Sequence, residues 1–423
     1  MRDHLEKITA LDGKIGAFQT VYAEDAMRSA EAADKLYEAG FQLGPFHGIP
    51  FVLKDICELE GRITTGGCKA NAKRVSSVTG TVAKRLLAAG GVLLGKTKTV
   101  EHALGGWGTN TQMGTPWNPW DLYVHRVPGG SSSGTGTSVG AGLTVCGVGT
   151  DTGGSVRLPA AYCGIVGLKV TEGRIPTDGI IPLSHLDTPG PMARSVHDAW
   201  MMFQVMDGAD VTTPKPAAID GLRLGVMNEM ERALCDADVL SDYDAAIETL
   251  AALGAQLEEF SAQRPYADLT ETCGRLIMAE AYFHHGHLYD QPLLPLDEDV
   301  RKRMLAGRDI AARDYLAMKA ERQVGSAEFL SRMDGFDAIL TPTTLTTAPP
   351  VSEVVQDVAP SHFTRIANFF GLCALSMPIA LSPAGLPTSL QVMARPFHED
   401  LALRIGAAYE AARGPFPEPR LTR

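Results

Sequence analysis

Glycine dominates the middle of this chain, where ten of the 26 residues from Gly129 to Gly154 are glycine. So dense a run excludes a long regular helix or strand, and it lets the backbone turn sharply and approach other atoms closely. An apolar run, Leu143 to Val148, separates a Ser-rich part, PGGSSSG (128–134), from a second part, GTDTGGSVRLP (149–159). We predict that the apolar run is a strand, that a turn follows it and that a short helix begins at Ser155.

Two common uses of a glycine-rich tract fit this one poorly. The phosphate-binding pattern GxxxxGK[ST] does not occur, and GVGTDTGG lacks the GxGxxG spacing. The segment GSSSG (130–134) matches GxSxG with Ser132 at its centre, but that motif directly follows a strand. Pro128 and two glycines occupy that place, and proline cannot donate to a strand ladder. We therefore assign Ser132 a supporting role rather than a reacting one.

A third interpretation takes the turn and the helix start together. We expect four successive backbone N–H groups to converge there and to suit a developing oxyanion, namely those of Thr152, Gly153, Gly154 and Ser155. Ser155, whose hydroxyl lies beside them, becomes the candidate nucleophile. No His–Asp pair that could serve as its base is evident. Lys54, at the end of the apolar segment GIPFVLKDI (48–56), is the alternative base, because burial lowers the pKa of a lysine.

Helices and strands alternate along the chain, which indicates an α/β fold. Residues 81–98 predict a helix, a Gly-Gly stop and a short strand, whereas 222–227, 337–344 and 373–381 predict further strands. A Pro-rich connection at 207–220 could separate two domains. We interpret the strands predicted at 337–344 and 373–381 as members of the same sheet as the earlier strands, so we predict one domain.

Composition excludes several classes of function. The net charge is −11 at pH 7 and no basic patch is evident, so we expect no direct binding of nucleic acid. The seven cysteines include no CxxC pair, which favours reduced, buried thiols and a cytoplasmic protein. No apolar stretch approaches the ~20 residues of a membrane span. The N-terminus, MRDHLEKITALDG, predicts an amphipathic helix rather than a signal peptide.

Three ordered segments resemble those that define the amidase signature family, namely GIPFVLKD, PGGSSSG and GTDTGGSVRLPAAYCGIVGLK. Ser155 lies 24 residues after Ser131, as the paired serines of that family do. The resemblance continues to LDTPGPMARSVHD (186–198), resumes at FDAILTPT (336–343) and extends to residue 410, so it covers most of the chain.

The resemblance implies an α/β fold in which helices cover both faces of a mixed central β-sheet. It implies one amidase domain over residues 1–423. Within that domain we expect a signature core at about 45–205, a variable helical region at about 210–330 and a return to the sheet at about 335–423.

The same resemblance implies a Ser–cis-Ser–Lys triad. Ser155 would be the nucleophile, and Ser131, after a cis peptide from Gly130, would link it to Lys54. Asp151 and Arg157 look like the family's structural ion pair. The implied reaction is hydrolysis of a carboxamide C–N bond through a serine acyl-enzyme, with no metal and no cofactor. Carbamates, ureas and hydrazides offer the same kind of carbonyl to the nucleophile.

Residues of the substrate pocket are harder to assign. Trp107 and Gly130 are candidates to contact the substrate, a small amide. Arg322 resembles the arginine with which family members bind a substrate carboxylate, although a solvated arginine is an equal alternative. We interpret FHHGH (283–287) as a surface or pocket-edge cluster rather than a metal site, because no carboxylate spacing completes it.

A different function within the same family stays open. The glutaminase (A-type) subunit of a tRNA-dependent amidotransferase carries the same triad but works in a complex, where a partner can bind the RNA. Hydrolysis of simple amides by the chain alone would separate the two functions. No sequence feature fixes the oligomeric state, and a homodimer remains open.

Overall fold

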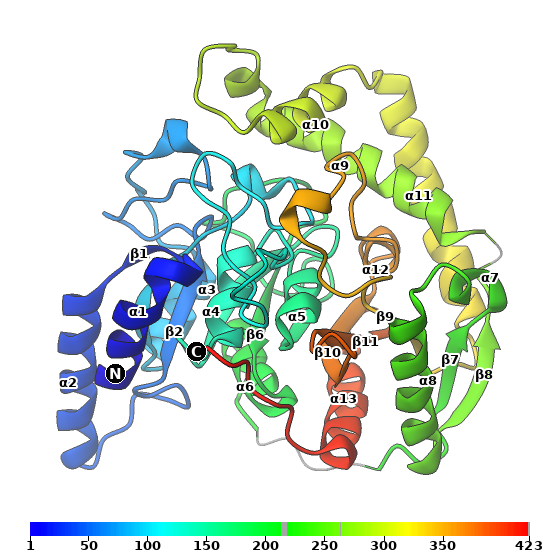
Figure 1. Cartoon of the computed structure of the whole chain (residues 1–423), viewed down its shortest axis with the longest axis horizontal. Helices are drawn as coiled ribbons and strands as arrows, with labels where there is room; N and C mark the ends of the chain where they lie inside the picture. Colours follow the sequence, from blue (N-terminus) through cyan, green and yellow to red (C-terminus); the bar gives the residue numbers. More distant parts are fainter. Residues whose placement is uncertain (213–217, 263, 422–423) are drawn as a thin grey trace.

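Eleven strands form one mixed sheet in the computed structural model, which describes residues 1–212, 218–262 and 264–421 (Figure 1). Their order across the sheet is β1-β3-β2-β4-β6-β5-β10-β11-β9-β7-β8. Strand β2 is parallel to both β3 and β4, β7 is parallel to β8 and β9, and the other neighbours are antiparallel. The strands are β1 Phe18–Val21, β2 Pro50–Lys54, β3 Val92–Thr97, β4 Cys146–Asp151, β5 Val166–Lys169, β6 Thr188–Ala193, β7 Arg223–Met227, β8 Gln256–Phe260, β9 Ala338–Pro342, β10 Cys373–Leu381 and β11 Pro387–Ala394.

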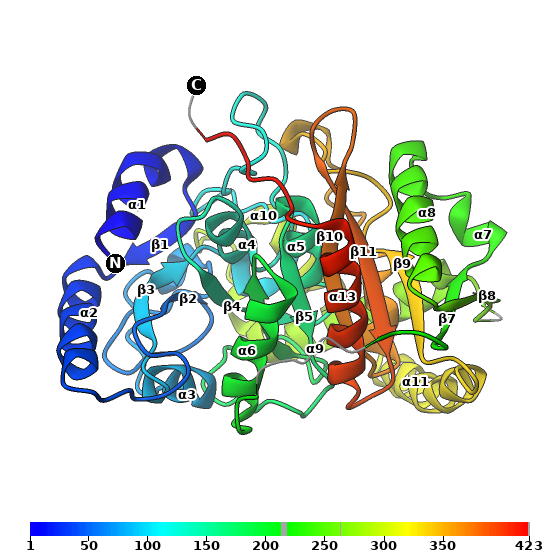
Figure 2. The same cartoon turned by 90° about the horizontal axis from the view of Figure 1, so that it is seen from below.

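Helices cover both faces of this sheet, which confirms the expected fold class. In Figure 2, α6, α8 and α13 lie in front of the strands, and α4 and α5 lie behind them. The long helices α9, α10 and α11 extend beyond the sheet on the side of α12 (Figure 1). The helices are α1 Arg2–Ile15, α2 Ala23–Glu38, α3 Thr81–Ala88, α4 Ser133–Gly140, α5 Arg157–Cys163, α6 Val196–Asp207, α7 Glu229–Arg232, α8 Ala237–Ala252, α9 Tyr266–Tyr289, α10 Glu298–Arg308, α11 Ala312–Arg332, α12 Thr364–Phe369 and α13 Glu399–Arg413.

The sheet draws on distant parts of the chain. Strands β1 to β6 come from its first half and β9 to β11 from its end. Strands β7 and β8 come from the region expected to be helical at about 210–330, within which only β7 was predicted as a strand, at 222–227. The antiparallel pair β10–β11 lies between β5 and β9, so it joins the two outer parts of the sheet.

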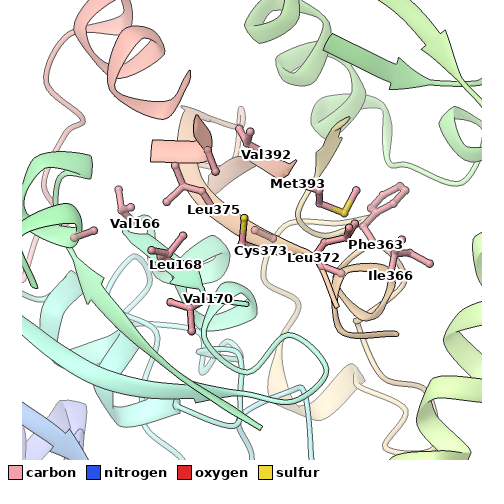
Figure 3. Packing of buried hydrophobic residues seen from close by; sticks show 14 of the residues in the cluster. Val166, Leu168, Val170, Phe363, Ile366, Leu372, Cys373, Leu375, Val392 and Met393 are labelled. Atoms are coloured by element: carbon pink, nitrogen blue, oxygen red, sulfur yellow. The ribbon is translucent and has the colours of Figure 1, made fainter. Parts of the chain in front are cut away.

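Apolar side chains from these strands fill a continuous core beside β10. Val166 and Leu168 of β5 face Leu375 of β10, and Val392 of β11 lies on the other side of that strand (Figure 3). Each of these side chains is fully buried. Burial of such residues supplies the main favourable term in folding, so the C-terminal strands are part of the core and not an appendage.

Local boundaries differ from the expectation around the glycine-rich tract. The strand expected at 143–148 is β4, Cys146–Asp151, and the helix expected from Ser155 begins at Arg157. Residues 152–156 therefore form an irregular turn, held in part by the Asp151 side chain, as described below.

Strand β6 escaped prediction because its sequence, TPGPMA, contains two prolines and a glycine. Proline has no N–H to donate to a ladder and is rare in central strands. Here β5 pairs only with Met192 and Ala193, so Pro189 and Pro191 lie beyond the β5 ladder.

Two further expectations concern cysteines and membranes. All seven cysteines are free, and six of them are buried, as expected. Among the described residues, no helix combines the length and the apolar character that crossing a bilayer requires.

Candidate active site

The site forms where two parallel strands end at the same edge of the sheet. Strands β2 and β4 are hydrogen-bonded neighbours that run in the same direction. Lys54 is the last residue of β2, and the turn that carries Ser155 leaves the end of β4. Adjacent carboxyl ends of parallel strands are a common place for binding and catalytic groups.

Lys54 lies fully buried at the centre of this edge. Its Nζ donates a hydrogen bond of 2.8 Å to the Ser131 hydroxyl and one of 2.7 Å to the Thr150 hydroxyl. No carboxylate among the described residues lies within salt-bridge distance of it. Burial lowers the pKa of Lys54 to about 7. The more distant carboxylates of Asp187 and Asp151 act in the opposite direction and raise this pKa, but their effect is smaller. A substantial share of the lysine is therefore neutral near neutral pH.

Ser131 follows a cis peptide bond from Gly130, as the resemblance implied. Its carbonyl accepts hydrogen bonds from the Thr99 hydroxyl, at 2.9 Å, and from the Val100 N–H, at 3.2 Å. The Ser132 hydroxyl donates to the carbonyl of Thr150 and accepts from its N–H. These bonds hold the Ser-rich segment against the end of β4, so Ser132 supports the site without reaching its centre.

Ser155 lies between the end of β4 and the start of α5. The N–H of Ser132 donates to the Ser155 carbonyl at 3.2 Å, which holds the two serine segments side by side. Among the described residues, the Ser155 hydroxyl has no hydrogen-bond partner, and this side chain lines a cavity. A hydroxyl so placed is free to meet a bound substrate.

Three of the four expected oxyanion donors are free in the part of the chain that the structure describes. The N–H groups of Thr152, Gly153 and Ser155 have no acceptor there, but that of Gly154 donates to the Asp151 carboxylate at 2.8 Å. The expectation for Gly154 is therefore wrong in this structure, because the carboxylate that ends β4 already binds this N–H. Gly154 instead serves the turn through its φ of 127°, and a Cβ there would lie 2.3 Å from the Thr364 hydroxyl.

Asp151 and Arg157 form a fully buried, bidentate ion pair under the turn, with N–O distances of 2.9 and 3.0 Å. Burial alone would raise the pKa of Asp151, but the Arg157 guanidinium brings it well below its usual range. Arg157 also donates to the Thr364 carbonyl, the Gln391 side chain and the Asn368 side chain, each at 2.7 Å. The pair links β4, α5, α12 and β11, a bracing role rather than a reacting one.

A cavity of about 350 Å³ opens in front of Ser155. Thr152, Gly153 and Ser155 lie on one side of it, and residues of α9, α10 and the segment before α12 lie on the other. Trp107 lines it, and its Nε1 donates to the Val358 carbonyl at 2.7 Å. Gly130 does not line it and is packed against the backbone of Gly108.

The structure does not bring Arg322 to this cavity. Its Nη2 is paired with Glu172 at 2.6 Å, and its Nε donates to the Phe369 carbonyl at 2.8 Å. Its Nη1 lies 3.3 Å from His185 Nε2. Because these partners occupy the guanidinium, an anchoring role for Arg322 has no support in the geometry. The arginines that do line the cavity are Arg275, Arg303 and Arg365.

Comparison with known proteins shows the family to which this chain belongs. The family model described as Amidase matches residues 1–403. The chain belongs to the amidase family. It is 35% identical over 419 residues to the 2-amino-5-chloromuconic acid deaminase of Comamonas testosteroni, covering 96% of this chain and 90% of that protein. It is also 35% identical to the A-type subunit of the glutamyl-tRNA(Gln) amidotransferase of Geobacter metallireducens, covering 97% of this chain and 93% of the relative.

Solved structures agree with the sequence comparisons. A crystal structure of an amidase superposes with a TM-score of 0.90 at 30% identity, covering 98% of this chain and 95% of the other. The protein is thus an amidase in fold and in family, an enzyme that hydrolyses the C–N bond of amides.

The histidines of FHHGH are scattered around α9 of this amidase. His285 is buried, bonds to the Pro182 carbonyl at 2.6 Å and stacks on His102 at 4.2 Å between ring centroids. A different trio, Cys68, Glu101 and His102, has possible ligand atoms within 4.8 Å of one another. Tyr289 already hydrogen-bonds to both Glu101 and His102, so internal partners engage these two groups.

Several residues of the site carry no local sequence signal. Thr150 accepts from Lys54, yet nothing in a strand sequence distinguishes such a threonine. Thr364, Asn368 and Arg365 lie on α12, about 200 residues after Ser155, and only the fold brings them to the turn. Nothing in the short sequence of α12 marks Arg365 as a residue of the site.

Proposed function

We propose that this amidase acts through Ser155 as nucleophile, with Ser131 and Lys54 as the proton relay. The observation that carries the proposal is the 2.8 Å hydrogen bond between Lys54 Nζ and the Ser131 hydroxyl, made by a buried lysine whose pKa is lowered to about 7. A neutral amine in that position can accept a proton from a serine hydroxyl.

The steps follow from this placement. Lys54 accepts the proton of Ser131 while Ser131 accepts that of Ser155, whose Oγ attacks the amide carbonyl carbon. The N–H groups of Thr152, Gly153 and Ser155 bind the resulting oxyanion. The proton returns through Ser131 to the leaving nitrogen, the C–N bond breaks, and water then hydrolyses the acyl-enzyme. Ser131 and Ser155 meet when substrate binds, because catalytic hydrogen bonds often tighten only in the complex.

The substrate in this proposal is a small carboxamide, with carbamates, ureas and hydrazides as neighbouring classes. The relative named as a deaminase of 2-amino-5-chloromuconic acid supports a substrate that is a small acid. A second function, that of the A-type component of an amidotransferase complex, is supported by the relative named for that role. A cytoplasmic location and a homodimer stay predictions.

The test uses the purified chain alone on aliphatic and aryl amides, a carbamate, a hydrazide, glutamine and asparagine, and measures release of ammonia or amine. Ser155→Ala and Lys54→Ala should each lower kcat/KM by at least about a thousand-fold, as loss of a triad member does elsewhere. Ser133→Ala is the matched control, because the Ser133 hydroxyl is buried beside the triad without a partner. Full activity of Ser155→Ala would refute the proposed nucleophile. Activity of the wild type only with a second protein chain would favour the amidotransferase function.

A further inference from the structure

The cavity in front of Ser155 is lined by more arginines than carboxylates. Among the described residues, Arg275, Arg303 and Arg365 form no salt bridge, although all three line the cavity. The two carboxylates that also line it, Glu271 and Asp357, lie exposed to solvent. A cavity with this surplus of positive charge favours a ligand that carries negative charge.

The guanidinium of Arg365 leaves hydrogen-bond donors without partners inside the protein. Its Nη1 donates to the Thr270 carbonyl at 3.1 Å, whereas its Nε is buried without any partner, and no bond of its Nη2 exists in the described residues. The nearby Arg157 shows the contrast, since its Nε, Nη1 and Nη2 all have partners. A buried donor left without an acceptor costs stability, so its persistence points to an acceptor that arrives from outside.

The guanidinium of Arg365 lies beside the oxyanion turn. A Cβ on Gly153 would lie 3.5 Å from its Nε, and a Cβ on Gly274 would lie 2.7 Å from its Nη1. Gly274 belongs to α9 and Arg365 to α12, two helices that pack side by side (Figure 1). The absence of a side chain at Gly274 therefore leaves room for the guanidinium between α9 and the turn.

The other two arginines are less suited to this role. Arg303 donates from Nε to the Leu104 carbonyl and from Nη1 to the Gln356 carbonyl, each at 3.1 Å. Arg275 is exposed to water. Arg365 alone combines a buried, unpartnered Nε with a position against Gly153, and its Nε and Nη2 form a fork that matches the two oxygens of a carboxylate.

We propose that Arg365 binds a carboxylate of the substrate, so that the preferred substrates are amides that carry a carboxylate near the scissile carbonyl, such as monoamides of short dicarboxylic acids. This inference rests on the proposed function. Gly153 lies two residues before Ser155, so a carboxylate held at Arg365 is separated from the attacked carbonyl by only a short chain. A cavity of about 350 Å³ suits a molecule of that size.

The test compares pairs of amides that differ only in charge. Succinamate and succinamide have the same shape, and malonamate with malonamide and glutaramate with glutaramide extend the series in length. We expect kcat/KM for the best monoamide to exceed that for its diamide by on the order of ten- to a hundred-fold, the effect of one charge-assisted bidentate contact. A diamide cleaved as fast as its monoamide would overturn the inference.

Variants then assign the preference to Arg365. Arg365→Gln should lower kcat/KM for the monoamide on the order of ten- to a hundred-fold and leave the diamide nearly unchanged, and Arg365→Lys should restore part of the preference. Arg404→Gln is the matched control, because Arg404 also has a buried Nε without a partner but lies on α13, outside this cavity. An equal loss for both amides in Arg365→Gln would contradict the proposal and indicate a structural role.

Binding separates this inference from the proposed function. Ser155→Ala, which cannot form the acyl-enzyme, should bind succinamate or a homologue more tightly than the diamide in titration calorimetry, and Ser155→Ala/Arg365→Gln should lose that difference. Equal binding of both members, or no binding of any monoamide, would overturn the inference about Arg365. Retained hydrolysis by Ser155→Ala would instead overturn the proposed nucleophile.

Discussion

Three buried lysines lie near the catalytic edge, and their partners give them different roles. Lys96 is paired with Asp55 at 3.6 Å, and Lys169 donates to the carbonyls of Val170 and Leu372. Lys54 contacts two hydroxyl groups instead, so its proton can be exchanged with a group that reacts. A neighbouring carboxylate would have kept the lysine charged.

The state of Lys54 predicts how activity depends on pH. Burial lowers the pKa of Lys54 to about 7, so the lysine is protonated below that pH and cannot accept a proton. We expect kcat/KM to rise about tenfold per pH unit below pH 7 and to level off above it. The measurement is a pH–rate profile on a substrate whose charge does not change in this range.

Lys54→Arg is the control for that profile, because a guanidinium stays charged at every working pH. It should be inactive throughout. A wild-type profile that is flat or that falls from pH 6 to 8 would contradict the assignment of Lys54 as base.

Single residues differ in how far the sequence predicts them. Lys54, Ser131 and Ser155 stand in short motifs, and the resemblance of these motifs to those of the amidase signature family implied that the three residues form one triad. Arg365 was not predicted, because its role follows from missing partners, which only a folded structure reveals. For Gly154, the sequence shows a flexible residue but not that its N–H binds the Asp151 carboxylate.

At the scale of elements, the turn between β4 and α5 sets the geometry of the site. The Asp151 side chain accepts from the N–H groups of Gly154 and Val156, at 2.8 and 3.1 Å. From the other side, the Thr364 hydroxyl of α12 donates to the Gly153 carbonyl at 2.8 Å. The turn is thus fixed from the strand that precedes it and from a helix about 200 residues later.

Gly154→Ala tests how much the site depends on this turn. The new Cβ would meet the Thr364 hydroxyl at 2.3 Å at a φ of 127°, so the turn must move. Because misplacement by about 1 Å can cost on the order of a hundred-fold in rate, we expect kcat to fall at least about tenfold. Gly173→Ala is the control, with a φ of 79° and no atom within 4 Å of the new Cβ. Equal kcat in both variants would contradict the role of the turn.

The predictability of whole elements follows from their local chemistry. The helix and strand of 81–98 and the strand β10 have regular apolar patterns with clear ends, and both were predicted. Strand β6 was missed because its prolines oppose strand formation locally, and its neighbours β4 and β5 enforce it. The short edge strand β8 was missed because its exposed, polar sequence resembles a loop.

At the scale of the whole molecule, the sheet and the cavity are each built from residues that lie far apart in the sequence. Strands β10 and β11 sit between β5 and β9, and the cavity takes residues from α9, α10 and the segment before α12 as well as from the glycine-rich turn. We propose that the chain is one domain for this reason. No sequence pattern predicts which distant helices close a cavity, because that depends on packing across the full sheet.

We propose that one chain holds every group that the proposed reaction needs. The most direct test mixes the purified chain alone with a cleaved amide, quenches with acid during steady turnover and locates the acyl group by peptide mass spectrometry. We predict an acyl adduct on Ser155 that is absent from Ser155→Ala. An adduct on another residue, or turnover by Ser155→Ala, would contradict the account.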